Sequence, residues 1–552
     1  MEIVITRTGD PWMDWGLVAL AQVAEDNPEL DGELESGMLR LSVTNVEVAS
    51  NLLRNYLVEQ LNRCVLRPLE VKLLGYGAKR LETGFLDPGQ EWKLSDKERQ
   101  YAVERLRHFE AKRQRKNVDA EDLRVPKIKP GAKVTASLKR NYPGIKKDWE
   151  KLGKAVDEDV RAFFDQWRSG GDKPCSLCGR EAAVEYEMRQ NKNPFYNQHH
   201  NNVVRGHRGS VVVASMCPTC NLLNTFAAAC ADLPYFVEGR THLLVPQVDD
   251  LTLLAEVRHL IRNNSLDMAS PLLLSYRTNI RELPGGDADL YTSLIGVYWN
   301  LRHRYTYHEE TGLEDWDFGL EPAKQTKVGR WVVYRYSKGT NVIFAHFNFL
   351  QVNSRLFKLV ESLQYGDGKE GDLYRHLLRF MSAGNRRSRE LFSEGLVSRN
   401  WRHVSTALFD LYKEGRPLAT GFARPFFDYA LEVDNVLEKQ LLEDVRTVSG
   451  IIGRVFASDV GLMTSINNAH DETTLRRVLK DAFLKMHKIA ATTKKFGGED
   501  VWAPKESRVE NILSSVNKEN VAEIRDTMLI YASLAAMHNL RNEKKEQGGE
   551  AK

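Results

Sequence analysis

Four cysteines near the middle of the chain have the spacing of a metal site. Cys175 and Cys178 form one Cys-x-x-Cys unit, and Cys217 and Cys220 form a second one further along. Each unit can direct two sulfur atoms at one ion, and four thiolates satisfy the tetrahedral coordination that zinc prefers. Four thiolates also leave no open position for a catalytic water. The sequence therefore predicts a structural Zn²⁺ ion and identifies no catalytic residue; two unrelated pairs of buried cysteines are the weaker alternative.

The stretch between the two cysteine units is rich in amide side chains. Asn191, Lys192, Asn193 and Gln198 lie there, and such groups can read the edges of nucleobases in nucleic acids. A solvated, asparagine-rich surface loop accounts for the same composition equally well. We retain both interpretations, and we take these four residues as candidate nucleic-acid contacts.

A histidine pair in the same stretch raises an alternative function. His199 and His200 follow the first cysteine unit, and an endonuclease of HNH type would use one histidine as general base beside a divalent ion. The further ligands that such a nuclease needs do not occur at the usual places around the two cysteine units. A zinc-stapled nuclease is therefore the alternative, not the leading hypothesis.

A strongly basic stretch precedes the cysteines. The whole chain has a net charge of only +3, but the residues from Lys112 to Lys154 include 14 basic and 5 acidic residues, a surplus of 14 − 5 = 9. Such a surplus can neutralise phosphates, and Tyr142 and Trp149 can stack on unpaired bases. Prolines and glycines predict that most of it is a loop or an extended arm, with a solvated linker as the alternative. The candidate contacts in this arm are Lys112, Arg113, Arg115, Lys116, Lys127, Lys129, Lys133, Lys139, Arg140, Lys146 and Lys147.

Two smaller basic clusters follow in the second half of the chain. The first contains Arg386 and Arg387 and continues over Arg389, Arg399, Trp401 and Arg402; the second contains Arg477, Lys480 and Lys488. Each cluster alone is typical of a solvated face, but three basic segments in one chain suit a protein that binds a long polyanion. Around the second cluster, an apolar stripe predicts a helix with these cations on its opposite face: Leu475, Val478, Leu479, Ala482, Met486 and Ile489.

The elements that must position these residues indicate an α+β protein of several domains. The chain has 552 residues, of which 42% are apolar and 28% charged, as is ordinary for globular proteins. We divide it into a mixed α/β N-terminal region (1–110), a basic arm or linker (111–155), a zinc-finger-containing region (156–282), a mixed α/β region with a hairpin around residues 338–341 (283–424) and a C-terminal helical bundle (425–552). The remainder after the zinc finger is expected to be mostly helical.

The sequence predicts no membrane segment. No apolar run reaches the roughly 18 residues that a membrane span requires. The amino-terminal MEIVITRTGD lacks the basic and apolar segments of a secretory signal. We therefore expect a cytoplasmic protein.

Two features together resemble a known family, the CXXC-CXXC group of large subunits of type I CRISPR Cascade complexes, and they are most similar to subtype I-B. The first feature is the amino-terminal RTGDPWMDWGLVAL, with Gly9, Asp10, Pro11, Asp14, Gly16 and Leu20. The second is the pair CSLC and CPTCN. The layout, with an α/β front, a central zinc finger and a helical carboxyl end, is similar over essentially the whole length, although the middle third matches only in outline.

The resemblance implies a non-catalytic subunit of an RNA-guided DNA surveillance complex in antiviral defence. Such a subunit recognises the short motif beside the target and starts duplex opening toward an R-loop, while guide–target pairing reads the sequence. The implied partners are the guide RNA, the target DNA, the backbone, guide-5′-end-binding and small subunits of the complex, and a helicase-nuclease recruited in trans. Residues 425–552 resemble the separate small subunit and are expected to hold the displaced strand. The remaining alternative is a zinc-containing protein-interaction scaffold.

Overall fold

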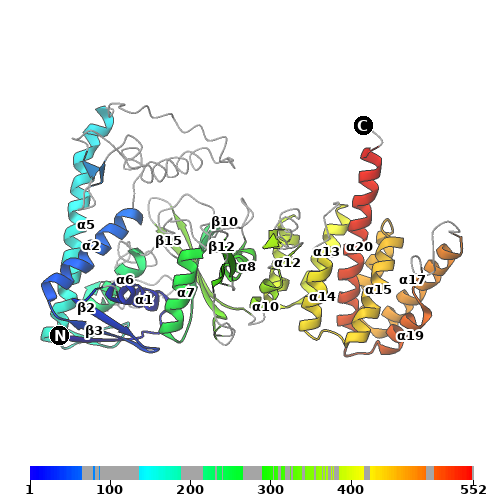
Figure 1. Ribbon diagram of the computed structural model, residues 1–552, viewed down its shortest axis with the longest axis horizontal. Coiled ribbons are helices and arrows are strands. Elements are labelled where there is room, and N and C mark those ends of the chain that lie inside the picture. Colours follow the sequence, from blue (N-terminus) through cyan, green and yellow to red (C-terminus); the bar gives the residue numbers. More distant parts are fainter. Residues whose placement is uncertain are drawn as a thin grey trace, which may run out of the picture. The chain divides into compact units, whose positions relative to one another are not determined.

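The computed structural model describes most of the chain, in two compact units (Figure 1). The described residues are 1–25, 27–64, 79–80, 86–87, 136–187, 215–229, 233–238, 240–264, 289–301, 304–308, 313–317, 324, 327–338, 342–352, 356–363, 365–366, 369–370, 374–375, 377, 385–415, 423–492 and 503–549. Unit 1 comprises Met1–Arg281, Gly286–Ala288 and Gly319–Gln351; unit 2 comprises Glu282–Gly285, Asp289–Phe318 and Val352–Lys552. The expected α+β fold with a mostly helical remainder is confirmed.

Unit 1 begins with a small antiparallel sheet. Its strands are β1 (Glu2–Thr6), β2 (Leu30–Leu34) and β3 (Met38–Val43), in the order β1-β3-β2. Along β1, Ile3 and Ile5 are buried while Glu2 and Thr6 are exposed, so one face of the strand packs on the core and the other meets solvent.

Helix α1 (Pro11–Glu25) is buried on nearly all sides. Asp10 caps its first turn, because its Oδ1 accepts hydrogen bonds from the backbone N–H groups of Trp12 and Met13 at 2.9 and 3.0 Å. Pro11 occupies the first helical position, where a missing N–H costs nothing. An apolar helix of this kind needs cover from several elements. Its neighbours include β2, α6 (Pro218–Ala229) and α7 (Leu251–Asn264).

Two longer helices, α2 (Val46–Cys64) and α5 (Ala136–Ser169), pack against each other. The predicted basic arm is wrong over its last part, because residues 136–155 are the first half of α5. The reason lies in the sequence: Leu138, Tyr142, Ile145, Trp149 and Leu152 recur every three or four residues, which is the period of a helix. This apolar period prevails over Pro143 and Gly144. Residues 111–135 lie outside the described part of the chain.

The predicted hairpin is confirmed and belongs to a four-stranded sheet of unit 1. The strands are β10 (Tyr235–Glu238), β11 (Arg240–Pro246), β14 (Arg330–Lys338) and β15 (Val342–Gln351), in the order β10-β11-β14-β15. β14 and β15 are antiparallel, with Lys338 opposite Val342. Because β11 pairs with β14, this sheet joins two segments that the sequence had placed in separate regions, 156–282 and 283–424.

Short strand pairs complete the description of unit 1. They are β4 (Lys79–Arg80) with β5 (Leu86–Asp87), β6 (Lys173–Pro174) with β7 (Glu181–Ala182), and β8 (Tyr186–Glu187) with β9 (Ser215–Met216). The β6–β7 pair flanks the first cysteine unit, and β9 leads directly into the second. The β8–β9 pair therefore brings the chain that follows the first cysteine unit next to the start of the second.

Unit 2 contains two hairpins and many helices. The strands are β12 (Arg304–His308) with β13 (Leu313–Asp317), and β16 (Tyr365–Gly366) with β17 (Lys369–Glu370). The first helices are α8 (Leu290–Leu301), α10 (Leu356–Glu361), α12 (Arg386–Ser398), α13 (Trp401–Lys413) and α14 (Ala423–Val433). Helix α8 is almost wholly buried, and α10 and α12 pack against it.

The C-terminal part of unit 2 is helical, as predicted. It consists of α15 (Lys439–Val455), α16 (Val460–Asn467), α17 (Glu472–Thr492), α19 (Glu506–Ser515) and α20 (Val521–Gly549). Helices α13, α15 and α16 pack along α20. The predicted stripe of α17 is confirmed: Leu475, Val478, Leu479, Ala482 and Met486 are buried and Ile489 is half-buried. Across the described residues, no helix combines the length and the apolar character that crossing a bilayer requires.

Candidate metal centre

The four predicted cysteines come together in unit 1. All four sulfur atoms lie within 4.8 Å of one another. The Sγ atoms of Cys175 and Cys220 are 3.8 Å apart, and those of Cys178 and Cys217 are 3.7 Å apart. A disulfide bond would bring two sulfurs to about 2.05 Å, and all four cysteines are free. Each close pair consists of one cysteine from each Cys-x-x-Cys unit. The four sulfurs of the two Cys-x-x-Cys units therefore surround a position that can hold a metal ion.

The first cysteine unit lies in a tight turn between β6 and β7. The backbone N–H of Cys175 donates to the carbonyl of Arg180, and the N–H of Gly179 donates to the carbonyl of Cys175, both at 2.9 Å. Gly179 has a φ of 70°, a left-handed conformation that favours glycine. The N–H of Leu177 donates to Cys175 Sγ at 3.4 Å. The turn thereby directs the sulfurs of Cys175 and Cys178 to the same side.

The second cysteine unit forms the start of helix α6. Cys217 precedes Pro218, the first helical residue, and its Sγ accepts from the N–H of Cys220 at 3.4 Å, as a capping side chain does. The N–H of Cys217 itself donates to Cys175 Sγ at 3.2 Å. The positive end of a helix stabilises a thiolate. Cys217 and Cys220 are thus presented in a setting that favours metal binding.

The thiols perturb one another strongly. Hydrogen bonds from Cys178, Cys217 and Cys220 lower the pKa of Cys175. The hydrogen bond with Cys175 is the largest cause that raises the pKa of Cys217 and of Cys220. Four negative charges at these separations repel one another, so a full set of thiolates requires a cation among them. The donor set fits a divalent metal ion.

Gln166 of α5 supports both cysteine units and was missed by the sequence reasoning. Its Oε1 accepts from the backbone N–H and the hydroxyl of Thr219, at 3.0 and 2.9 Å. Its Nε2 donates to the carbonyl of Glu181, at the other turn, at 3.5 Å. Gln166 is only 7% exposed. Its one sequence signal is a polar residue beside Trp167 within a run of apolar helix positions.

The amino-terminal motif packs directly against the helix that carries Cys220. A β-carbon at Gly16 of α1 would lie 2.0 Å from the carbonyl oxygen of Leu223, so α1 and α6 meet backbone to backbone. Next to this contact, Trp12 Nε1 donates to the buried Asn224 Oδ1 at 2.9 Å. The two sequence features that carry the family resemblance are therefore one packed assembly.

Asp14 holds the loop that precedes α1. Its Oδ1 accepts from the N–H and the hydroxyl of Thr8, both at 2.9 Å, and its Oδ2 accepts from Arg7 Nε at 3.1 Å. Arg7 Nη2 also donates to Asp249 Oδ1, at 2.6 Å. Burial raises the pKa of Asp14, and the hydrogen bonds from Thr8 and Arg7 oppose that shift. The polar residues of the amino-terminal motif thus hold the loop backbone at Thr8 against the first turn of helix α1.

A cleft of about 300 Å³ opens beside the cysteine cluster. Three segments line it: the end of β1 with the loop that follows, the turn that carries Cys178, and the first turns of α6. Cys178 is half-buried whereas Cys175, Cys217 and Cys220 are buried. The cleft could not be predicted from the sequence, because its walls come from three distant parts of the chain.

Many of the predicted nucleic-acid contacts lie outside the described residues. These are Lys112, Arg113, Arg115, Lys116, Lys127, Lys129, Lys133, Asn191, Lys192, Asn193 and Gln198, together with His199 and His200. Lys139, Arg140, Lys146 and Lys147 lie on the first half of α5. For these residues the roles in nucleic-acid binding stay predictions.

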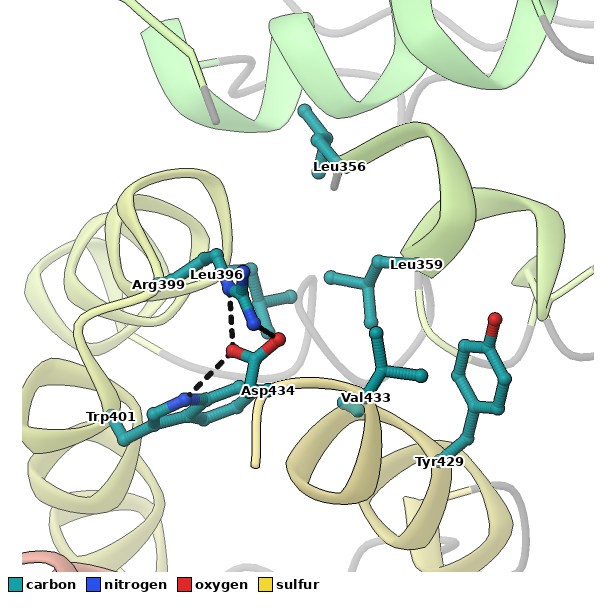
Figure 2. Close-up of a pocket in the computed structure, with 9 residues that line it drawn as sticks. Leu356, Leu359, Leu396, Arg399, Trp401, Tyr429, Val433 and Asp434 are labelled. Carbon is teal, nitrogen blue, oxygen red and sulfur yellow. Dashed lines mark hydrogen bonds and ion pairs between the residues drawn. The ribbon is translucent and has the colours of Figure 1, made fainter. Parts of the chain in front are cut away.

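The first of the smaller basic clusters is largely committed to internal ion pairs. Arg399 pairs with Asp434, and Trp401 Nε1 donates to Asp434 Oδ2 at 3.0 Å. Figure 2 shows this group at the base of a small apolar pocket, with Leu356, Leu359, Leu396 and Val433 around it. Arg389 contacts the buried Asp289 at 3.3 Å, and Arg402 contacts the buried Asp526 at 3.1 Å. Arg389, Arg399 and Arg402 are thus engaged in ion pairs within unit 2, and a role for this cluster in polyanion binding stays a prediction.

The remaining predicted cations lie on helix surfaces. Arg386 and Arg387 are exposed in the first turn of α12, and Arg386 pairs with Glu390 at 2.6 Å. Cations at a helix N-terminus oppose the helix dipole, so helix stability does not explain their position. On α17, Arg477, Lys480 and Lys488 are exposed on the side opposite the buried stripe, as predicted.

Comparison with known proteins does not assign the chain to a family. No family model matches the sequence, and no curated protein matches it at a significant level.

Proposed function

We propose that the chain is a non-catalytic subunit of an RNA-guided DNA surveillance complex, similar to the large subunits of type I CRISPR Cascade complexes. One observation carries the proposal: the amino-terminal motif and the two cysteine units, which together carry the resemblance, pack on each other through Gly16 and Leu223. Because the two motifs share one core, they support the resemblance to the Cascade large subunits together. Two motifs on unrelated domains would support it more weakly.

The metal in this proposal is a structural Zn²⁺ ion held by Cys175, Cys178, Cys217 and Cys220. Zinc–sulfur bonds of about 2.3 Å in a tetrahedron place the sulfurs about 3.8 Å apart. The close pairs here are 3.8 and 3.7 Å apart. A bound ion would supply the positive charge that four thiolates need and would fasten the β6–β7 turn to α6. The ligand set is complete with four sulfurs, so the site supports folding rather than catalysis.

Nucleic acid is the proposed ligand of the exposed cations. Arg386 and Arg387 on α12 and Arg477, Lys480 and Lys488 on α17 are exposed cations that would contact phosphates, and the basic stretch before α5 would add to them. In the proposed role, the chain binds the motif adjacent to the target, helps to open the duplex and holds the displaced strand. Guide RNA, the other Cascade subunits and a recruited helicase-nuclease would be its partners.

The test is to purify the tagged chain from its native cell, sequence any bound RNA and identify the co-purifying proteins. The same preparation is then incubated with duplex DNA and a divalent metal ion. Short RNAs of repeat-spacer form, with further Cascade subunits and no cleavage, are the expected result. A chain that cuts DNA alone, and loses cleavage when His199 and His200 are replaced, would establish the nuclease instead. A chain with neither RNA nor cleavage would leave a zinc-containing scaffold.

A further inference from the structure

The cleft beside the cysteine cluster has the size of a site for one small ring. Its volume of about 300 Å³ lies at the lower end of the roughly 300 to 1,000 Å³ of ligand pockets. The side chains of Ile5 and Leu223 supply apolar wall. The remaining lining is polar, so the identity of the ligand depends on which donors and acceptors the walls present.

The lining of the cleft includes hydrogen-bond acceptors. The hydroxyl of Thr8 donates to Asp14 Oδ1, and the hydroxyl of Thr219 donates to Gln166 Oε1, both at 2.9 Å. A hydroxyl has a single hydrogen, so both oxygens can offer only lone pairs to the cleft. Cys178 and Cys220 belong to the same lining, and a thiolate only accepts. These residues therefore favour a ligand with N–H groups.

Arg180 supplies the opposite chemistry. Its Nη2 donates to the carbonyl of Val4 at 2.9 Å, and its guanidinium lies over the ring of Trp167, with 4.0 Å from Cζ to the ring centroid. Among the described residues it forms no ion pair with a carboxylate. Arginine has five N–H donors and no acceptor. The cleft thus combines a fixed cationic donor with an acceptor wall.

A cleft that has both acceptors and the cationic donor Arg180 disfavours most small chemical groups as ligands. A phosphate would pair with Arg180 but would face the sulfurs and the lone pairs of Thr8 and Thr219. A lysine or arginine side chain of a protein partner would suit the acceptors but would be repelled by Arg180. A neutral ring that carries an N–H donor next to a carbonyl or ring nitrogen satisfies both sides. The edge of an unpaired nucleobase has this pattern.

We propose that the cleft binds one unpaired nucleobase of a nucleic-acid strand, with its donor edge toward Thr8, Thr219 and the cysteine sulfurs and its acceptor edge toward Arg180. This inference rests on the proposed function, because it assumes that the chain contacts single-stranded nucleic acid. It names a subsite made by the β1 end, the cysteine turn and α6.

The experiment measures the binding of a labelled 20-nucleotide single strand of mixed sequence to the full chain at low salt, by fluorescence anisotropy. Thr6 is exposed and lines the cleft, so Thr6→Trp fills it; Ser42→Trp, at an exposed position of the neighbouring strand β3, is the control. Arg180→Gln removes the donor, and Arg240→Gln, at an exposed position of β11, removes one positive charge elsewhere in unit 1. Circular dichroism and metal content verify that each variant is folded.

Loss of one base contact is expected to weaken binding about tenfold in Thr6→Trp and Arg180→Gln, as for other single-base contacts. Ser42→Trp and Arg240→Gln should stay within about twofold of the unmodified chain, because they leave the cleft intact. Equal binding by all four variants would overturn the cleft assignment while leaving the proposed function in place. A chain that binds no strand at low salt would overturn the proposed function and the cleft assignment together.

Discussion

Gly16 and Leu223 are in contact through their backbones, since a β-carbon at position 16 would lie 2.0 Å from the Leu223 carbonyl oxygen and 2.8 Å from its carbonyl carbon. Backbone atoms cannot turn aside as a side chain can. The helix α1 can approach α6 only because position 16 has no side chain. The position of the Cys220-bearing helix therefore depends on a glycine more than 200 positions earlier in the chain.

Gly16→Ala is expected to lower the free energy of unfolding by about 3 kcal/mol, the upper part of the range for overpacked cores. Chemical denaturation measures it. The matched control is Gly153→Ala on α5, where an added β-carbon meets nothing within 4 Å in the described residues. That change should leave stability unchanged or raise it by up to about 1 kcal/mol, because alanine favours helix. Equal effects of the two changes would argue against the tight contact.

Metal analysis should find one zinc ion per chain. Cys217→Ser is expected to abolish zinc binding and to lower the free energy of unfolding by several kcal/mol, because the binding energy of a structural metal is folding energy. Ser176→Ala changes the exposed neighbour of Cys175 and should retain the metal. Elemental analysis by plasma mass spectrometry checks both. Absence of zinc from the unmodified protein would disprove the assignment.

The ion pair of Arg399 and Asp434 is expected to be essential for unit 2. Their side chains are 16% and 9% exposed, and Asp434→Ala would leave the Arg399 charge buried without its partner. Such a loss costs about 3 to 5 kcal/mol. Glu390→Ala removes the exposed partner of Arg386 and should cost less than about 1 kcal/mol. Thermal unfolding followed by circular dichroism compares the two variants, and a similar small effect would show that Asp434 is dispensable.

The contribution of Asp471 to the stability of helix α17 is expected to depend on pH. Hydrogen bonds from the side chain and the backbone of Thr474 lower the pKa of Asp471 below its ordinary value. Since the folded pKa is depressed, the charged carboxylate stabilises the fold at pH values above the ordinary pKa, and this contribution is lost as the pH falls through the folded pKa. Asp471→Ala should lower the melting temperature at pH 7 but not in strong acid. Asp471→Asn retains a capping oxygen and should remove this pH dependence.

The cations of α17 predict a salt-dependent effect on nucleic-acid binding. Arg477→Ala should weaken the affinity for all strand sequences alike and reduce the slope of log affinity against log salt by about 1. Lys518→Ala removes an exposed charge from the segment between α19 and α20 and serves as the control. Binding titrations at four salt concentrations distinguish them. A sequence-selective loss in Arg477→Ala would indicate base reading instead of phosphate contact.

The cysteine cluster could be predicted because its signal is local: two residues at fixed spacing in one turn determine where two sulfurs point. The helix α5 shows the opposite case. Pro143 and Gly144 predict a loop, but the apolar period of residues 138–152 continues in the same register to Val156, Val160 and Phe163. A period maintained over several turns outweighs one unfavourable pair of residues, since packing, not intrinsic propensity, stabilises most helices.

The arginines at α12 and α13 show that the order of charges along a sequence does not reveal which ion pairs form in the fold. Arg399 and Arg402 look alike in the sequence, yet their partners Asp434 and Asp526 lie far along the chain. The net charge of a short sequence segment counts its cations but leaves out acidic residues that lie far along the chain and pair with those cations in the fold. The cleft was unpredictable for the same reason, because Thr8, Arg180 and Thr219 become neighbours only in the folded unit.

The sulfur pair of Cys178 and Cys217, 3.7 Å apart, also fixes the two ends of the stretch between them, residues 179–216. For a chain segment whose two ends are held, each doubling of its length costs only about 0.6 kcal/mol. Insertions, deletions and complete replacements within residues 188–214 should therefore be tolerated by the rest of unit 1. A metal ion held by the four cysteines would thus separate two properties of unit 1, because the length and sequence of this stretch could change while the surrounding fold stays the same.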